Sequence, residues 1–197
     1  MLKIWGRRNS SNVRKVLWCA EEIGLAYESI EVGGSFGGTQ AADYQAMNPN
    51  GLVPAIEDNG LPLWESNAIV RYLSARYALG TLYPEDAAER ARGEKWMDWT
   101  TSTLAEPFKA VFWGVVRTPA EKQNWDSINA GRQACIDALS TVDSVLADQP
   151  YLSGDTFGIG ECDVLAHSYG ATVASTLAKQ HPYRVGKLVF VSPASAF

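Results

Sequence analysis

The chain has 197 residues, enough for one large domain or two small ones, and its 46% hydrophobic and 20% charged residues are ordinary for a globular protein. Its net charge of -5 lacks the basic excess expected of proteins that bind nucleic acid or an anionic membrane surface, and no apolar run approaches the roughly 20 residues of a membrane span. Three widely spaced cysteines without a CxxC pair argue against a disulfide framework, a zinc site or a dithiol redox centre.

The chain opens with alternating strand and helix signals. Residues 2–5 (LKIW) predict a short strand, without the layout of a signal peptide before it, so we expect a cytoplasmic protein. Capping side chains at residues 10–12 then precede apolar residues at helical spacing, which predicts a helix that ends at Gly24. Residues 27–32 (YESIEV) predict a second strand, and residues 41–47 (AADYQAM) predict a short helix after a glycine-bearing loop.

Two further strands and a third helix follow. Residues 53–57 (VPAIE) and 61–64 (LPLW) are joined by Asp-Asn-Gly at residues 58–60, which is a hairpin signal. From Ser66, the segment SNAIVRYLSARYA predicts a helix. The residues expected on one side of this helix are Ile69, Val70, Leu73 and Tyr77.

The composition changes after residue 79, where long helical patterns begin. Residues 87–116 form one such pattern, in which Pro107 predicts a kink, and residues 120–147 form another. Trp96 and Trp99 are predicted core residues of this part. We therefore expect an α/β domain at residues 1–79, a linker at 80–86, a helical domain at 87–160 and an atypical tail at 161–197.

Four local motifs resemble the glutathione transferases, in particular their bacterial theta-like branch. They are NSSNVRKV after the first strand, NPNGLVPAI before the hairpin, LWESNAIVRYL entering the third helix, and EKWMDW. The resemblance covers roughly residues 1–160. It implies a thioredoxin-like α/β domain followed by an all-α domain, in a homodimeric detoxification enzyme. Such an enzyme activates glutathione as a thiolate for attack on small electrophiles, with glutathione as co-substrate and no metal.

The resemblance places Ser10 at the position of the thiol-activating serine. A hydroxyl that donates a hydrogen bond at the positive end of a helix lowers the pKa of a thiol, which is near 8.5 when free. Ser10 also has a simpler interpretation as a helix cap. Ser11 is adjacent and is an alternative for the same task, and Asn12 is a candidate either to orient the thiol or to cap the helix.

Two further motifs match the glutathione-binding segments of the family. The resemblance implies a cis bond between Val53 and Pro54, which presents the backbone of Val53 to the cysteinyl residue of glutathione like an added strand. Glu65 would accept a bond from the γ-glutamyl ammonium, and Ser66, as a helix N-cap, would bind the γ-glutamyl carboxylate. The alternatives are a proline that begins a strand and ordinary helix capping.

The electrophile is expected beside the thiolate, against the long kinked helix. Phe108, Phe112 and Trp113 are candidates to line an apolar cleft there, although an aromatic stripe at helical spacing is also typical of a core. Asp98 is a weaker candidate to reach the γ-glutamyl ammonium across a dimer, against its simpler interpretation as an exposed helix acid. Cys19 is predicted to be a buried helix residue.

The resemblance ends near residue 160. The Ser/Thr-x-x-Asp capping box of the family would fall at residues 158–161, where Gly158 lacks the hydroxyl and Glu161 keeps an acid. The tail carries AHSYG at residues 166–170, the pattern of a nucleophile elbow, in which a strand-to-helix turn exposes a serine, here Ser168. This pattern resembles an α/β-hydrolase fragment and suggests a fused or rearranged gene.

The tail lacks the other parts of a hydrolase. In that fold the acid and the histidine base follow the elbow on later strands, and the chain offers neither there. We therefore expect a glutathione transferase, with an activity that the tail impairs if it disrupts the helical domain. The alternatives are a non-catalytic glutathione-binding or interaction module and, less favoured, a serine hydrolase that uses Ser168.

Overall fold

The N-terminal part of the protein is a four-stranded sheet. The structure is a computed structural model that describes residues 1–161; the tail from residue 162, including the predicted elbow at Ser168, lies outside the described residues. The strands lie in the order β2-β1-β3-β4, with β1 parallel to β2 and the other pairs antiparallel. Their bounds are β1 (Leu2–Trp5), β2 (Tyr27–Ile30), β3 (Ala55–Asp58) and β4 (Leu61–Trp64).

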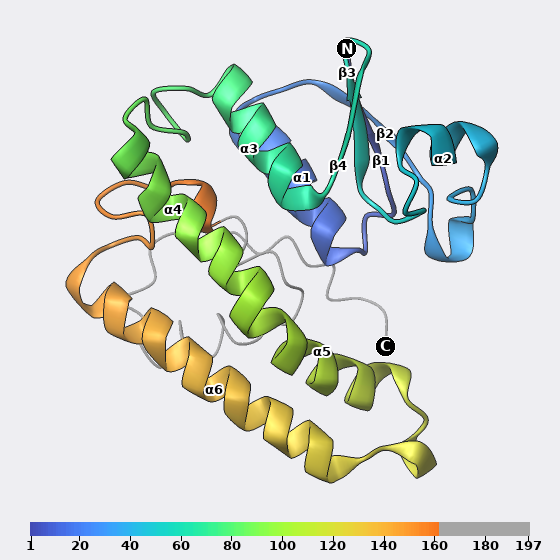
Figure 1. Ribbon diagram of the computed structural model, residues 1–197, viewed down its shortest axis with the longest axis vertical. Helices are drawn as coiled ribbons and strands as arrows, with labels where there is room; N and C mark the ends of the chain where they lie inside the picture. Colours follow the sequence, from blue (N-terminus) through green and yellow to red (C-terminus); the bar gives the residue numbers. More distant parts are fainter. Residues whose placement is uncertain (162–197) are drawn as a thin grey trace.

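Helices cover both faces of this sheet (Figure 1). Helices α1 (Ser11–Glu22) and α3 (Ser66–Tyr77) pack side by side on one face, and the short α2 (Ala42–Met47) lies on the other side. The helical spacing of the apolar residues explains the packing, because they form one buried stripe on each helix. The fully buried residues between α1, α3 and the sheet are Ile4, Val13, Val16, Ile56, Ile69, Val70 and Leu73.

The turn between β3 and β4 and the last turn of α3 can both be compared with the sequence predictions. The hairpin signal is confirmed, since Asn59 and Gly60 between β3 and β4 both have positive φ angles (51° and 86°), as a two-residue hairpin turn requires. Of the residues expected on one side of α3, Ile69, Val70 and Leu73 are fully buried, whereas Tyr77, in the last turn, is 38% exposed. The Tyr77 hydroxyl instead donates to the buried carboxylate of Asp58 (2.6 Å), which also accepts from the Tyr72 hydroxyl (2.8 Å).

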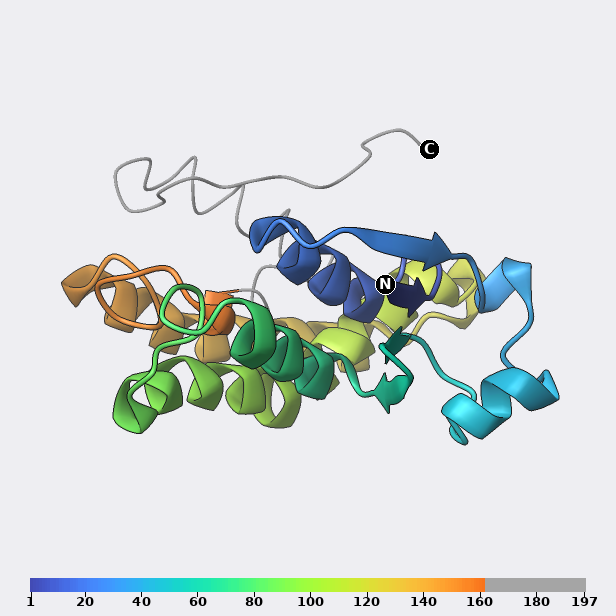
Figure 2. The same cartoon turned by 90° about the horizontal axis from the view of Figure 1, so that it is seen from above.

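The second part of the described chain consists of long helices that run diagonally beside the sheet domain (Figures 1 and 2). They are α4 (Ala87–Trp99), α5 (Ala105–Phe112) and α6 (Trp125–Asp148), with π-helical turns at Thr100–Leu104 and Trp113–Arg117 and a short 3-10 helix at Ala120–Lys122. A further 3-10 helix, Gly34–Phe36, lies between β2 and α2 in the sheet domain. Trp96 is buried, as expected, and packs edge-on against the partly buried Trp99 with ring centroids 5.4 Å apart.

Both predicted long helices differ from those observed. The first is interrupted by the π-helical turn at Thr100–Leu104, which ends before Pro107. Proline lacks an N–H and its ring clashes with the carbonyl four residues earlier, at residue 103, so the widened turn is where the backbone adjusts. The second begins at Trp125 rather than at residue 120, because the side chain of Asn124 accepts a bond from the N–H of Ser127 (3.1 Å) and caps the helix there.

The incomplete capping box at residues 158–161 has a substitute for its missing hydroxyl. The buried Glu161 carboxylate accepts bonds from the N–H of Gly158, from the N–H of Ser153 and from the Ser153 hydroxyl, each 2.9 Å long. A methyl group built on Gly158 would lie 2.7 Å from Oγ of Ser153. The Ser153 hydroxyl therefore occupies the space that a side chain at residue 158 would need.

Replacing Glu161 by alanine is expected to lower the free energy of unfolding by about 1.5–3 kcal/mol, because the buried N–H of Gly158 and the partly buried N–H of Ser153 lose a charged acceptor. Urea unfolding followed by tryptophan fluorescence measures this change, with Glu121→Ala, at an exposed position, as the control. Equal unfolding midpoints for Glu161→Ala and the parent protein would contradict the role that we assign to this carboxylate.

Candidate functional site

Three loops that carry predicted site residues leave the sheet at one edge. The strand register aligns Trp5 of β1 with Ala55 of β3, and Ala55 with Trp64 of β4. The loop after Trp5 leads to Ser10, the loop before Ala55 holds Val53 and Pro54, and Glu65 follows Trp64 directly. The first turns of α1 and α3 therefore lie at the same end of the domain as the Val53 loop (Figure 1).

Ser10 is the N-cap residue of α1, but its side chain does not cap the helix. Its backbone is extended, its carbonyl accepts the first helical bond from the N–H of Arg14 (3.0 Å), and its hydroxyl makes no capping hydrogen bond. The side chain is half-buried. The helix begins at Ser11, which is also half-buried, and Asn12 is exposed in the first turn. The Ser10 hydroxyl is thus available for a ligand at the positive end of the α1 dipole.

The Val53 loop has the backbone arrangement that the resemblance implies. The peptide bond between Val53 and Pro54 is cis, and within the described residues no hydrogen bond reaches the N–H or C=O of Val53. The preceding carbonyl, that of Leu52, accepts bonds from the Tyr44 hydroxyl (2.6 Å) and from Nδ2 of Asn48 (2.8 Å). Because Tyr44 and Asn48 are buried, they hold this loop in place and leave the Val53 backbone open for pairing.

The start of α3 differs by one residue from the prediction. The expectation that Ser66 is the N-cap is wrong: Glu65 occupies that position and Ser66 is the first helical residue. Glu65 has a φ angle of 71°, in the left-handed region that non-glycine residues rarely adopt, and its side chain makes no capping bond. Ser66 is only 6% exposed. This arrangement presents N–H groups and a hydroxyl at a helix N-terminus, as in anion-binding sites.

A polar network that the sequence analysis missed fixes this turn to its neighbours. The side chain of Asn67 accepts a bond from Nζ of Lys15 on α1 (3.2 Å) and donates to the carbonyl of Met97 (3.2 Å) and to Oγ1 of Thr101 (3.3 Å). Lys15 is buried although it is charged. Lys15 does not share the helical spacing of Val13, Val16 and Ala20, so the apolar stripe of α1 carried no signal of this burial.

Asp98 makes an interaction within its own chain. Its carboxylate accepts a bond from Nη2 of Arg71 on α3 at 2.7 Å, while its side chain remains 73% exposed. Arg71 also lies near the carboxylate of Glu94 (3.7 Å). These contacts join α3 to α4. Within residues 1–161, the contact of Asp98 is with Arg71, and its proposed role toward a ligand stays a prediction.

The three aromatic candidates for an electrophile cleft do not form one cluster. Phe108 and Phe112 stack on α5 with ring centroids 6.0 Å apart, and both are partly buried. Trp113, at the start of the second π-helical turn, is 57% exposed. The stacked pair supplies an apolar surface, and its use by a substrate stays a prediction.

Cys19 lies away from the three loops that carry the candidate site residues. Cys19 is buried, as expected, beside Oγ of Ser74 (3.4 Å), and burial raises the pKa of its thiol to about 11, which makes it unsuited to nucleophilic chemistry.

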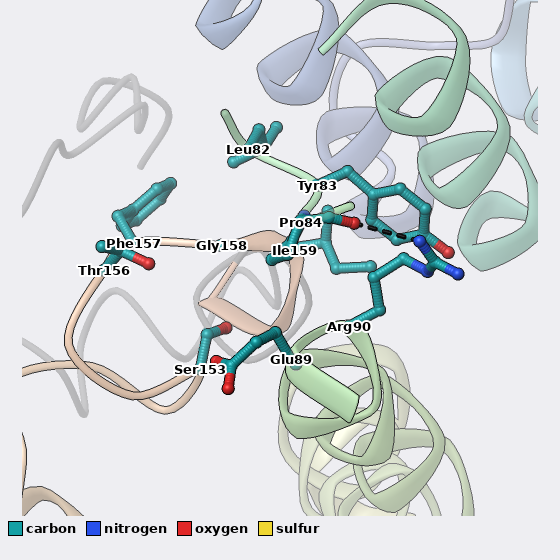
Figure 3. A pocket seen from close by; sticks show the side chains of 11 residues that line it. Leu82, Tyr83, Pro84, Glu89, Arg90, Ser153, Thr156, Phe157, Gly158 and Ile159 are labelled. Atoms are coloured by element: carbon teal, nitrogen blue, oxygen red, sulfur yellow. Dashed lines mark hydrogen bonds between the residues drawn. The ribbon is translucent and has the colours of Figure 1, made fainter. Parts of the chain in front are cut away.

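The hollow drawn in Figure 3 has a volume of about 20 Å³, room for roughly one water molecule. Tyr83 and Arg90 lie on one side of it, and Ser153 and Phe157 lie on the other.

A second hollow of about 350 Å³ is formed where α1 and α3 end, at the opposite end of these helices from Ser10 and Ser66. Neither hollow includes a candidate site residue. Among the residues that the structure describes, no helix is long and apolar enough to cross a membrane, and no three His, Cys, Asp or Glu side chains gather as a metal site would require.

Comparisons with known proteins match the arrangement of these loops. The family model described as the N-terminal domain of glutathione S-transferases matches residues 1–75. The chain is 45% identical to glutathione S-transferase GstB of Escherichia coli over 171 aligned residues. The aligned region covers 86% of this chain and 82% of that protein.

Solved structures show the same similarity over both domains. The theta class glutathione S-transferase of Xanthomonas axonopodis pv. citri, solved with glutathione bound, has a TM-score of 0.80 and 55% identity, over 88% of this chain and 82% of that chain. Glutathione transferase F2 of Populus trichocarpa has a TM-score of 0.78 and 25% identity, over 86% of this chain and 81% of that chain. The expected fold class, a thioredoxin-like domain followed by a helical domain, is therefore confirmed.

A second family model, described as the alpha/beta hydrolase fold, matches residues 92–197. The described part of that match, residues 92–161, contains helices and one isolated bridge between Tyr151 and Gly154, and no strand of a sheet. The predicted nucleophile elbow lies in the remainder, outside the described residues.

Proposed function

Because the chain belongs to the glutathione S-transferase family, we propose that its three loops at the sheet edge bind glutathione and activate the thiol as a thiolate for attack on small electrophiles. The chain is thus a glutathione transferase enzyme. The observation that carries the proposal is the register of Trp5, Ala55 and Trp64. It brings to one edge of the sheet a helix N-terminus, together with a hydroxyl and a backbone segment that have no hydrogen-bond partner among residues 1–161.

Ser10 is the residue that we assign to thiol activation. Its hydroxyl is free to donate to sulfur, and the N-terminus of α1 adds partial positive charge. A hydrogen bond to the charged form of a thiol lowers its pKa from about 8.5, so more glutathione is ionised at neutral pH. Ser11 and Asn12 remain the alternatives, because both lie in the same helical turn.

The other two loops hold the peptide. The free N–H and C=O of Val53 pair with the cysteinyl backbone of glutathione, next to Pro54. The buried Ser66 hydroxyl and the N–H groups of the first turn of α3 bind the γ-glutamyl carboxylate, and Glu65 accepts from the ammonium. These contacts are remote from sulfur, so they contribute to affinity rather than to ionisation.

The proposal also covers where the electrophile binds and the oligomeric state of the enzyme. The electrophile binds on the side of α5, against Phe108, Phe112 and Trp113. The enzyme functions as a homodimer in the cytoplasm, without nucleic acid, membrane or metal. Glutathione is its co-substrate.

Retention on immobilised glutathione, followed by a conjugation assay with a chromogenic aryl halide, tests the proposed function. Retention with turnover is expected. Retention without turnover would instead indicate the non-catalytic glutathione-binding module, and a protein that is not retained would contradict the proposal altogether. Elution with free glutathione controls for nonspecific adsorption.

The hydrolase match at residues 92–197 supports a narrower proposal about origin. The C-terminal segment derives from an α/β-hydrolase gene that was fused or rearranged near residue 160. The segment carries the elbow motif, but we assign it no hydrolase activity, because residues 169–197 contain no Asp or Glu to serve as the triad acid beside His181.

A fluorophosphonate probe is expected to leave Ser168 unlabelled, because a serine without an adjacent base is a poor nucleophile. Mass spectrometry of the treated protein measures the labelling, with an active serine hydrolase as the positive control. Stoichiometric labelling that disappears in Ser168→Ala would show that a base reaches this serine and would establish the hydrolase alternative.

A further inference from the structure

The second hollow, which we refer to as the α1–α3 hollow, has no task in the proposed function. Its volume of about 350 Å³ lies within the usual range of small-molecule pockets, roughly 300–1,000 Å³. The residues that line it come from the ends of two helices, from the linker and from the segment after α6. Those that the structure describes are Glu22, Ile23, Tyr77, Ala78, Thr81, Leu82 and Phe157.

Two helix C-termini meet at the α1–α3 hollow. Helices α1 and α3 run in the same direction and end at Glu22 and Tyr77 (Figure 1). The backbone carbonyls of these two residues accept no hydrogen bond from residues 1–161. Because the peptide dipoles of a helix sum to a partial negative charge at its C-terminus, two such partial charges border the hollow.

A carboxylate adds a full negative charge to this wall. The exposed Glu22 side chain makes no hydrogen bond or ion pair within the described residues, whereas the adjacent Glu21 accepts a bond from the Tyr27 hydroxyl (2.9 Å). No lysine, arginine or histidine is among the lining residues of the described part. Arg76 in the last turn of α3 is compensated by the buried carboxylate of Asp58, which lies 3.4 Å from its Nε.

Phe157 gives the α1–α3 hollow an aromatic wall. Its ring is held by edge-on contacts with Trp18 and Tyr151, whose ring centroids lie 5.6 Å and 5.9 Å away. Ile23 and Leu82 add apolar surface to the lining. The face of an aromatic ring attracts a cation that lies within about 6 Å of its centre, and aromatic-lined sites bind organic ammonium groups in this way.

We propose that the α1–α3 hollow binds a small organic cation, an ammonium group with an aromatic or alkyl substituent. The ammonium lies toward Glu22 and the two helix C-termini, and the substituent packs on Phe157 and the neighbouring apolar side chains. The same charges disfavour anionic ligands, glutathione included. The proposed glutathione site lies at the opposite ends of α1 and α3, so this inference does not depend on the proposed function.

Isothermal calorimetry of the full-length protein with benzyltrimethylammonium tests the proposal, and benzyl alcohol serves as a ligand that keeps the ring without the charge. The parent protein is expected to bind the cation about tenfold more tightly than the alcohol. Glu22→Gln removes the charge and keeps the size of the side chain, so it is expected to weaken the cation about three- to fivefold and to leave the alcohol unchanged. Phe157→Leu is expected to reduce the preference for the cation by a similar factor.

Glu21→Gln is the matched control, because it removes the same net charge at the adjacent residue and is expected to keep the parental affinity for benzyltrimethylammonium. Equal losses in the two glutamine variants would indicate a general effect of net charge and would overturn the inference. Equal affinities of the parent protein for the cation and the alcohol would also overturn it. So would a parent protein that does not bind the cation, the result expected if another part of the chain fills the hollow. The conjugation activity of Glu22→Gln should stay parental, so a failure of the proposed function remains distinguishable from a failure of this site.

Discussion

Replacing Ser10 by alanine is expected to slow conjugation about ten- to a hundredfold near neutral pH, with little change in the affinity for glutathione. A hydrogen bond to a charged group contributes about 1.5–3 kcal/mol, which corresponds to roughly one to two pKa units of the bound thiol. The Ser10 hydroxyl makes no capping bond, so its removal should cost α1 little stability. The loss should therefore fall on ionisation rather than on folding or binding.

The pH dependence follows from the direction of this shift. The serine donor stabilises the thiolate, so the mutant has the higher thiol pKa. Below both pKa values the thiolate fractions of parent and mutant differ by a constant factor, and the difference disappears as the pH rises above the mutant pKa. An ultraviolet titration of the thiolate in the glutathione complex measures both pKa values directly.

Ser11→Ala is the matched control, because it removes the same group one residue further along α1. It is expected to leave the thiol pKa close to the parental value. An unchanged pKa in Ser10→Ala, with a raised one in Ser11→Ala or Asn12→Ala, would transfer the activating role to that residue. Full activity of Ser10→Ala at pH 6.5 would refute the assignment by itself.

The arrangement of the sheet and its loops could be predicted because the signals for it are local. Asp-Asn-Gly at residues 58–60 favours one hairpin turn, and that turn aligns β3 with β4. The apolar stripes of α1 and α3 then specify which faces are buried. Once the strands are in this register, Ser10, Val53 and Glu65 must emerge at one edge.

The details that were not predicted depend on contacts between distant segments. The left-handed backbone of Glu65 moves the helix start by one residue, and no propensity of Glu65 indicates it, because isolated glutamate disfavours that conformation. The burial of Lys15 depends on Asn67, which is 52 residues away. In both cases a residue adopts a locally unfavourable state that its partners in the fold stabilise.

In the helical domain, too, the helices could be predicted from local signals, whereas their irregular turns could not. Amphipathic spacing predicts that residues 87–116 are helical, but the site of the distortion depends on how the chain accommodates Pro107, and the π-helical turn lies before it. Thr101 in that turn bonds to both Met97 and Asn67. The irregular turn thereby supplies one of the contacts that connect the helical domain to the start of α3.

Replacing Glu65 by glutamine is expected to weaken glutathione binding about ten- to a hundredfold, the usual effect of losing a charge-assisted bond. Glutamine keeps the size of the side chain and removes only the charge that attracts the γ-glutamyl ammonium. The thiol pKa of the bound ligand should stay close to the parental value, because this end of the peptide is remote from sulfur. Calorimetry with glutathione measures the loss, and N-acetylglutathione, whose amine is blocked, is expected to bind parent and mutant equally.

The backbone of Glu65 allows a second variant that separates binding from stability. Glycine adopts a φ angle of 71° without strain, whereas glutamate in that region costs on the order of 1 kcal/mol. Because the Glu65 side chain makes no capping bond, Glu65→Gly is expected to unfold at a higher urea concentration than the parent while binding glutathione at least as weakly as Glu65→Gln. A ligand-binding task for the side chain would account for a glutamate at a strained position where glycine is expected to be more stable. If Glu65→Gly bound glutathione with parental affinity, that task would not be ligand binding, and the γ-glutamyl end of the peptide would have to be placed elsewhere.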